Sequence, residues 1–172
     1  AKWFSDLNIE DTRIPYRNIS VDIKQSKESV NDRGRIEAAV RATGALPGIF
    51  PPVKIGDTLH VDGGVMNNLP TDQTRGIGIA KIIGIDIGAN ASPESSRHEQ
   101  SDPGLLSLIT LVATLGDSVA ADLHRKQCDL LLLPEVSGIK IFDFKLYKEA
   151  ISIGYNCAEK NKEKLFEIFY PN

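Results

Sequence analysis

A single carboxylate, Asp62, stands where a strand is expected to end. Leu59 and Val61 alternate with polar residues before it, which predicts a half-buried strand, and Gly63 and Gly64 supply the backbone freedom of a tight turn. In α/β proteins, ligands and catalytic groups gather at such strand ends. A carboxylate there can take a proton from an alcohol if its pKa is raised above its ordinary value of about 3.9. The simpler interpretation is a turn in which the carboxylate binds nearby backbone amides.

The motifs around this segment occur in a particular order. An apolar, proline-rich segment precedes Asp62, and Asn67, Asn68 and Pro70 follow the glycines. This order resembles the second half of a patatin-like phospholipase domain, in the bacterial branch that is similar to neuropathy target esterase. The matching segments are 9–11, 14–18, 21–23, 39–53, 59–70, 82–88, 142–144 and 153–155. The resemblance covers nearly the whole chain and is weakest between Asn90 and Gln127.

The resemblance implies a hydrolase with a serine–aspartate dyad. In that family the nucleophile is a serine in a Gly-x-Ser-x-Gly motif, and the Asp of the Asp-Gly-Gly motif is its base. Only the base carries over, to Asp62, because neither the serine motif nor the glycine-rich oxyanion loop occurs in this sequence. The nearest match, 116–120, ends in Ala and follows Asp62. Ser118 lies in an apolar helical pattern and is expected to be an ordinary helix residue, since a nucleophile elbow needs a strand, a sharp turn and a helix.

We therefore expect a lipid or carboxylic ester hydrolase, a phospholipase or lysophospholipase, to which this chain contributes the Asp. The nucleophile would come from the missing amino-terminal part of the same protein. The 172 residues would then be a single-domain fragment, the second half of a patatin-like domain, and inactive alone. The alternative is a catalytically silent α/β interaction or regulatory module. The lipid or ester that is cleaved depends largely on residues outside this chain.

Two further groups of residues are expected to serve the site. Asn67 and Asn68 would brace the loop through hydrogen bonds from their side chains to the backbone. A proline-stiffened apolar segment would form one wall of a pocket for the acyl chain. The residues expected in that wall are Leu46, Pro47, Ile49 and Phe50.

No metal or cofactor is expected. Asp57, His60 and Asp62 are close in sequence, but a short strand points alternate residues to opposite sides. Cys128 and Cys157 lie far apart without the spacing of metal ligands, so neither a zinc site nor a disulfide framework is indicated. An ordinary polar surface is a simpler interpretation of the first three than a metal site.

Composition limits the partners. The net charge of -3 and the pI of about 5.6 argue against binding to nucleic acid. No apolar run approaches the roughly 20 residues that span a bilayer. We expect a cytoplasmic protein, with peripheral contact to a membrane left open. Removal of the first half of the domain would expose a sheet edge, through which the chain could self-associate.

The hydrophobic patterns predict alternating strands and helices. Strands are predicted over 17–23, 58–61, 80–87 and 128–133, and helices over 35–42, from 68 or 71 to about 78, along 105–123 and over 144–168. The strand, helix and buried strand within 58–87 indicate a βαβ unit. We therefore predict an α/β fold, the carboxyl-terminal part of a patatin-like α/β hydrolase domain, with a mostly parallel sheet flanked by helices. In the last helix we expect four residues to face inward: Tyr147, Ile151, Tyr155 and Leu165.

Overall fold

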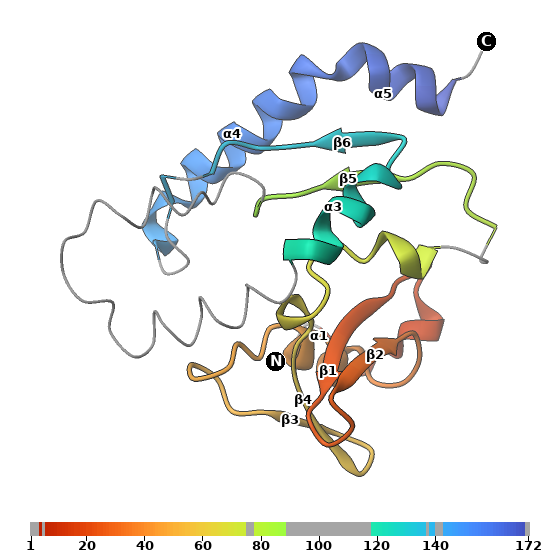
Figure 1. Cartoon of the computed structure of the whole chain (residues 1–172), viewed down its shortest axis with the longest axis vertical. Helices are drawn as coiled ribbons and strands as arrows, with labels where there is room; N and C mark the ends of the chain where they lie inside the picture. The colour runs from red at the N-terminus through yellow and green to blue at the C-terminus, as the bar shows by residue number, and fades with distance from the viewer. Residues whose placement is uncertain are drawn as a thin grey trace.

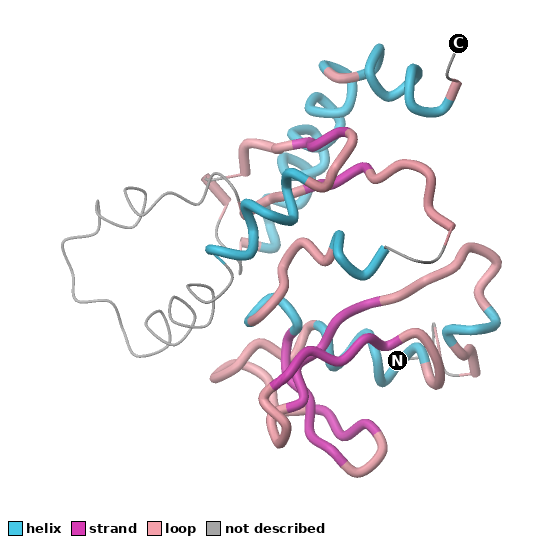
Figure 2. The backbone as a smooth tube through the Cα atoms, turned by 45° about the vertical axis from the view of Figure 1, so that its right-hand side comes forward, coloured by secondary structure: helices cyan, strands magenta, loops and turns pink. Residues whose placement is uncertain are grey.

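The computed structural model shows an α/β protein with two separate sheets (Figure 1). It describes residues 4, 6–74, 78–88, 118–136, 138–139 and 143–170. A four-stranded sheet and α1 make up one half of the picture, and a two-stranded sheet with α3, α4 and α5 makes up the other. The tube in Figure 2 shows the same two groups of elements from another side.

The larger sheet has the strand order β2-β1-β4-β3. Its strands are β1 (Asn18–Asp22), β2 (Lys27–Asn31), β3 (Val53–Ile55) and β4 (Thr58–Asp62). All three pairings are antiparallel, and in the central pair Ser20 lies opposite Asp62. Two tight turns make the hairpins: Ser26 has a φ of 52° before β2, and Gly56 has a φ of 58° before β4.

The prediction of a mostly parallel sheet is wrong for the described strands. Strands joined by a few residues pair antiparallel, because a parallel crossover needs a dozen or more residues. Here, β3 and β4 are separated only by Gly56 and Asp57. The sequence reading missed β2 and β3, and it placed β4 and the next strand in one βαβ unit although they belong to different sheets.

Helix α1 (Ile36–Thr43) covers one face of the larger sheet, and its range agrees with the prediction. Ala42 packs with Ala45 and with Val53, which lies opposite His60 in the β3–β4 pairing. Residues opposite each other share a face, so His60 lies on the side that α1 covers. Farther along, Ile36 and Ala39 of the helix pack on Ile9 of the short helix η1 (Ile9–Asp11).

The smaller sheet contains β5 (Ile83–Ile85) and β6 (Leu130–Leu132), which pair in parallel. Helix α3 (Ser118–Lys126) leads into β6. Both strands were predicted, but the expectation that the first is covered on both faces is wrong for Ile85, which is 60% exposed. Ser118 lies in a helix, as predicted. The part of the predicted helix at 105–117 lies outside the described residues.

The chain continues into η4 (Phe144–Leu146), α4 (Tyr147–Lys160) and α5 (Lys162–Phe169), which follow one another in Figure 1. One helix was predicted here; the break falls at Asn161, whose side chain donates to the Cys157 carbonyl at 2.9 Å. The inward orientation predicted for Tyr147, Ile151 and Tyr155 is wrong, because these side chains are exposed, while Leu165 is half-buried. Within the described ranges, no helix is both long and apolar enough to cross a bilayer.

Candidate active site

Asp62 is the last residue of β4 and the N-cap of a short 3-10 helix, η2 (Gly63–Val65). Its Oδ1 accepts a hydrogen bond from Gly64 N–H at 2.8 Å. Its own N–H donates to the carbonyl of Ala45 at 3.1 Å, which ties the strand end to the loop after α1. The carboxylate therefore occupies a fixed position at the end of the strand, as the sequence predicts.

Burial raises the pKa of Asp62, and the hydrogen bond from Gly64 offsets part of that increase. In the described part of the chain, Gly64 N–H is the only hydrogen-bond donor to this carboxylate, and no Lys or Arg forms an ion pair with it. A half-buried carboxylate with one donor and no cation holds a proton more readily than an exposed one. A general base requires a pKa that is raised in this way, because a carboxylate of ordinary pKa takes a proton from an alcohol only weakly.

The two glycines are needed for space and not for a positive φ, which neither residue has. A Cβ on Gly63 would lie 2.6 Å from the carbonyl carbon of Ile19, so a side chain there would collide with the backbone of β1. A Cβ on Gly64 would lie 3.2 Å from Oδ1 of Asp62. The Gly-Gly pair therefore lets the turn approach β1 and lets the amide of Gly64 reach the carboxylate.

Asn67 is buried behind this turn, with 2% of its surface exposed. Its Nδ2 donates to Glu28 Oε2 at 3.1 Å and to Asp72 Oδ1 at 3.0 Å. The expected bonds from this side chain to the backbone are therefore replaced by bonds to two carboxylates. Its Oδ1 is buried and has no partner among the described atoms. Asn68, in contrast, is exposed.

The loop after the turn is also anchored to α3. Thr71 Oγ1 donates to the His124 carbonyl at 3.1 Å, and Asp72 Oδ1 lies 3.7 Å from Nε2 of His124. Sequence reasoning missed Glu28, Asp72 and His124 as supports of the site. Because they are far apart in the chain and share no motif, their spacing carries no signal that could have revealed them.

A contact between a serine and a histidine lies next to Asp62. Ser20 Oγ is 2.9 Å from His60 Nδ1 and accepts from Asn31 Nδ2, also at 2.9 Å, while His60 Nε2 is 2.8 Å from Thr58 Oγ1. Ser20 is fully buried and His60 is 3% exposed, beneath the face that α1 covers. No substrate can reach this hydroxyl, so the group is a structural network that the sequence did not reveal.

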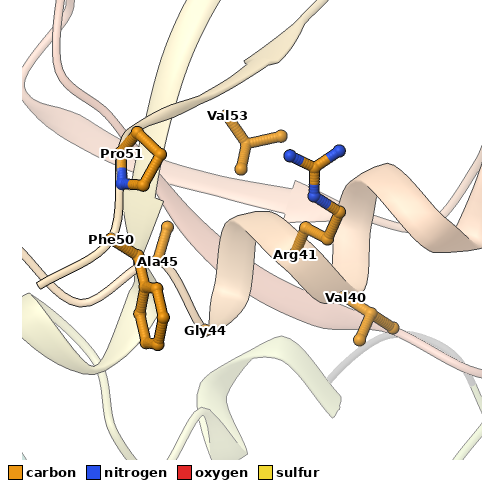
Figure 3. A pocket seen from close by; sticks show the side chains of 7 residues that line it. All are labelled: Val40, Arg41, Gly44, Ala45, Phe50, Pro51 and Val53. Carbon is orange, nitrogen blue, oxygen red and sulfur yellow. The ribbon is translucent and has the colours of Figure 1, made fainter. Parts of the chain in front are cut away.

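An open pocket of about 280 Å³ lies between α1 and the loop that follows it (Figure 3). Phe50 and Pro51 line it from the loop, and Val40 and Arg41 line it from α1. Ala45 belongs both to this pocket and to the backbone contact with Asp62. Of the four residues predicted for the acyl pocket, only Phe50 lines it; the half-buried Leu46, Pro47 and Ile49 do not.

Comparison with known proteins places this site in a family. The model of patatin-like phospholipases matches residues 1–75, a range that includes Asp62 and both glycines. Patatin-like phospholipase domain-containing protein 6 from Mus musculus is 32% identical over 97% of this chain. The chain belongs to the patatin-like phospholipase family. This assignment supports the patatin type of α/β fold.

Other relatives of this patatin-like chain carry similar names. Neuropathy target esterase sws from Drosophila melanogaster is 40% identical over 55% of the chain, which covers 7% of that relative. Patatin-like phospholipase domain-containing protein 7 from Rattus norvegicus is 28% identical over 88% of the chain and 13% of the relative. The chain spans 12% of the mouse protein 6. It therefore corresponds to a small part of each of these relatives.

The described residues of the patatin-like chain contain no group of three His, Cys, Asp or Glu side chains that could hold a metal ion. Asp57 is exposed in the β3–β4 turn, whereas His60 is bound to Ser20 and Thr58. Asp57, His60 and Asp62 therefore do not come together as the ligands of a metal ion. What the arrangement offers is a carboxylate with a raised pKa at a strand end, suited to accept a proton.

Proposed function

We propose that this patatin-like chain supplies the general base of a lipid or carboxylic ester hydrolase. The observation that carries the proposal is Asp62 itself: a half-buried carboxylate with a raised pKa, one amide donor and no cationic partner among the described residues. The family relationship supports the class of reaction, a patatin-like phospholipase or lysophospholipase.

In the proposed reaction, a serine from another part of the protein attacks the ester carbonyl while Asp62 takes the hydroxyl proton. The tetrahedral intermediate then collapses, the alcohol leaves with that proton, and an acyl-serine remains. Water, deprotonated by the same carboxylate, attacks the acyl-serine. The bond between the acyl carbon and the serine oxygen then breaks, the serine takes the proton back from Asp62, and the fatty acid is released. No cofactor takes part in these steps.

The buried network supports an external nucleophile. Ser20 has the register position nearest to Asp62, but its hydroxyl is occupied by His60 and Asn31 and has no access to solvent. Ser118 lies in the first turn of α3. The 172 residues on their own are therefore proposed to be inactive, with serine and oxyanion donors supplied by the amino-terminal part of the domain.

The pocket beside α1 is proposed to bind part of the acyl chain. Its wall contains Phe50, Pro51 and Val53, and Ala45 connects it through one backbone hydrogen bond to the amide of Asp62. Apolar walls with few polar groups are typical of such sites.

The test uses the longer protein that contains this chain and an alkyl fluorophosphonate, which labels activated serines. Asp62→Asn should reduce the labelling rate by at least about 100-fold, because a neutral amide cannot take the proton. The matched control is Asp57→Asn, at an exposed turn position, which should label like the wild type. Wild-type labelling of Asp62→Asn would overturn the proposal, whereas absence of labelling in the wild type would favour a catalytically silent module.

A further inference from the structure

A second turn of the same construction follows β5. Directly after β5, Asp86 Oδ1 accepts a hydrogen bond from Gly88 N–H at 2.8 Å. In the same way, Asp62 Oδ1 accepts one from Gly64 N–H at 2.8 Å. Each aspartate stands at the carboxyl end of a strand, and each bonds the glycine two residues later. The two turns belong to different sheets, so their relative position depends on side chains.

Asn68 lies between the two turns. A Cβ on Gly64 would be 3.0 Å from Asn68 Oδ1, and a Cβ on Gly88 would be 3.4 Å from Asn68 Nδ2. One end of the amide thus faces the Asp62 turn and the other end faces the Asp86 turn. An added methyl group on Gly64 would press on Asn68, whereas one on Gly88 would be in ordinary van der Waals contact with it. The Asn68 side chain is therefore close to both turns.

The Asp86 turn is fixed by a cation. Arg125 Nε donates to Asp86 Oδ2 at 2.7 Å, and the Asp86 side chain is only 5% exposed. Its backbone N–H donates to the Leu132 carbonyl at 3.0 Å, which ties the turn to β6. Breaking a largely buried ion pair leaves an uncompensated charge, so this turn resists displacement.

The aspartate that ends β4 and the aspartate that follows β5 therefore differ in their partners. Asp86 is paired with a guanidinium, which also contacts Asp122 at 3.0 Å. Asp62 has an amide donor and, among the described side chains, no cationic partner. The first is suited to hold structure, and the second is suited to accept a proton.

We propose that Arg125 is a positioning residue for the base Asp62. Its guanidinium fixes the Asp86 turn, that turn sets where Asn68 lies, and Asn68 in turn restrains the amide of Gly64. This inference rests on the proposed function, because the position of Asp62 matters to catalysis only if that carboxylate takes the proton.

The first test follows the Asp62 carboxyl carbon by ¹³C NMR in the 172-residue protein as the pH is varied. Asn68→Ala should lower the pKa of Asp62 toward its ordinary value, because a loosened turn admits water and weakens the effect of burial. Arg125→Lys should shift it in the same direction while the positive charge is kept. The control Asn156→Ala, an exposed position on α4, should leave the titration unchanged.

The double variant decides whether Arg125 acts through Asn68. If both belong to one chain of contacts, combining Asn68→Ala with Arg125→Lys should shift the pKa no further than the larger single change. Additive shifts, or an unchanged Asp62 titration in either single variant, would overturn the inference. Asn68 is exposed, so Asn68→Ala should fold and can be titrated even if Arg125→Lys, which alters the buried ion pair, does not fold.

A kinetic measurement in the longer protein separates this inference from the proposed function. Arg125→Lys should lower kcat by about 10- to 100-fold with little change in KM, as expected for a misplaced catalytic group. If Asp62→Asn keeps full esterase activity, the proposed function fails, while the NMR titrations still show whether Arg125 positions Asp62. An unchanged kcat in an Arg125→Lys protein that needs Asp62 would overturn the positioning role.

Discussion

Ser20 and Asp62 lie directly opposite each other in the antiparallel pairing of β1 and β4, yet the serine hydroxyl is bound to His60 and Asn31. The serine beside the proposed base therefore serves the interior of the protein. Without it, Nδ1 of the buried His60 and one proton of the buried Asn31 amide would lack a partner.

Ser20→Ala should separate these two roles. The change leaves Nδ1 of His60 and one amide proton of Asn31 without a partner, so we expect a loss of about 1–3 kcal/mol in the free energy of unfolding. Urea titration of the 172-residue protein measures it, with Ser152→Ala on the exposed side of α4 as the control. In the longer protein, labelling by the fluorophosphonate should persist. Complete loss of labelling in a folded variant would instead make Ser20 the nucleophile.

Replacing Gly63 and Gly154 by alanine should change the free energy of unfolding in opposite directions. Gly63→Ala places a methyl group against the backbone of Ile19, and we expect a loss of about 1–3 kcal/mol or more from overpacking. Gly154 lies inside α4 with nothing within 4 Å of the added Cβ, so Gly154→Ala should add about 0.5–1 kcal/mol of stability. Denaturation by urea checks both. Equal effects at the two positions would contradict the steric role assigned to Gly63.

The raised pKa of Asp62 makes stability depend on pH. Because burial raises this pKa in the folded state, folding is favoured by the protonated carboxyl at low pH, and that contribution is lost as the pH rises through the raised pKa. Asp62→Asn stays neutral, so it should be more stable than the wild type near neutral pH. The difference should shrink as the pH falls toward about 3.9. Urea midpoints across this range, with Asp57→Asn as control, test the sign.

The acyl-pocket assignment predicts a change in chain-length preference. Phe50→Ala removes an exposed ring from the pocket wall, so the longer protein should lose kcat/KM for long-chain p-nitrophenyl esters by about 10-fold and little for the acetyl ester. The matched control is Phe166→Ala on α5, which removes a similarly exposed ring elsewhere. An equal loss for all chain lengths would show that Phe50 supports the fold or the chemistry and does not contact the acyl chain.

Local patterns were sufficient for the strand that ends at Asp62 and for the helix that follows β2. Apolar alternation identified β4, and the apolar spacing within 35–42 identified α1. The β1–β2 hairpin could not be predicted in the same way, because Ser26 takes a positive φ without being glycine or asparagine. The Gly56-Asp57 pair, in contrast, is a recognised signal for a two-residue hairpin, so the β3–β4 hairpin could have been predicted.

Tertiary partners of the site were beyond a reading of local pattern. Asn67 is stabilised by Glu28, 39 positions earlier, and Asp86 by Arg125, 39 positions later. Such pairs form only in the folded protein, when segments far apart in the chain come together. They leave no periodic pattern in the sequence from which they could be predicted. The carboxylate proposed as the base could be found because it ends a strand, whereas the residues around it could not.

The polar network beneath α1 also fixes the alignment of β1 on β4. A shift of one residue along either strand would turn Ser20 to the opposite face and leave His60 buried without its hydroxyl partner. Apolar side chains alone would tolerate such a slip more easily, because one branched residue can replace another. Hydrogen bonds between unlike side chains accept a single alignment, and that alignment determines which residue of β4 reaches the end of the strand.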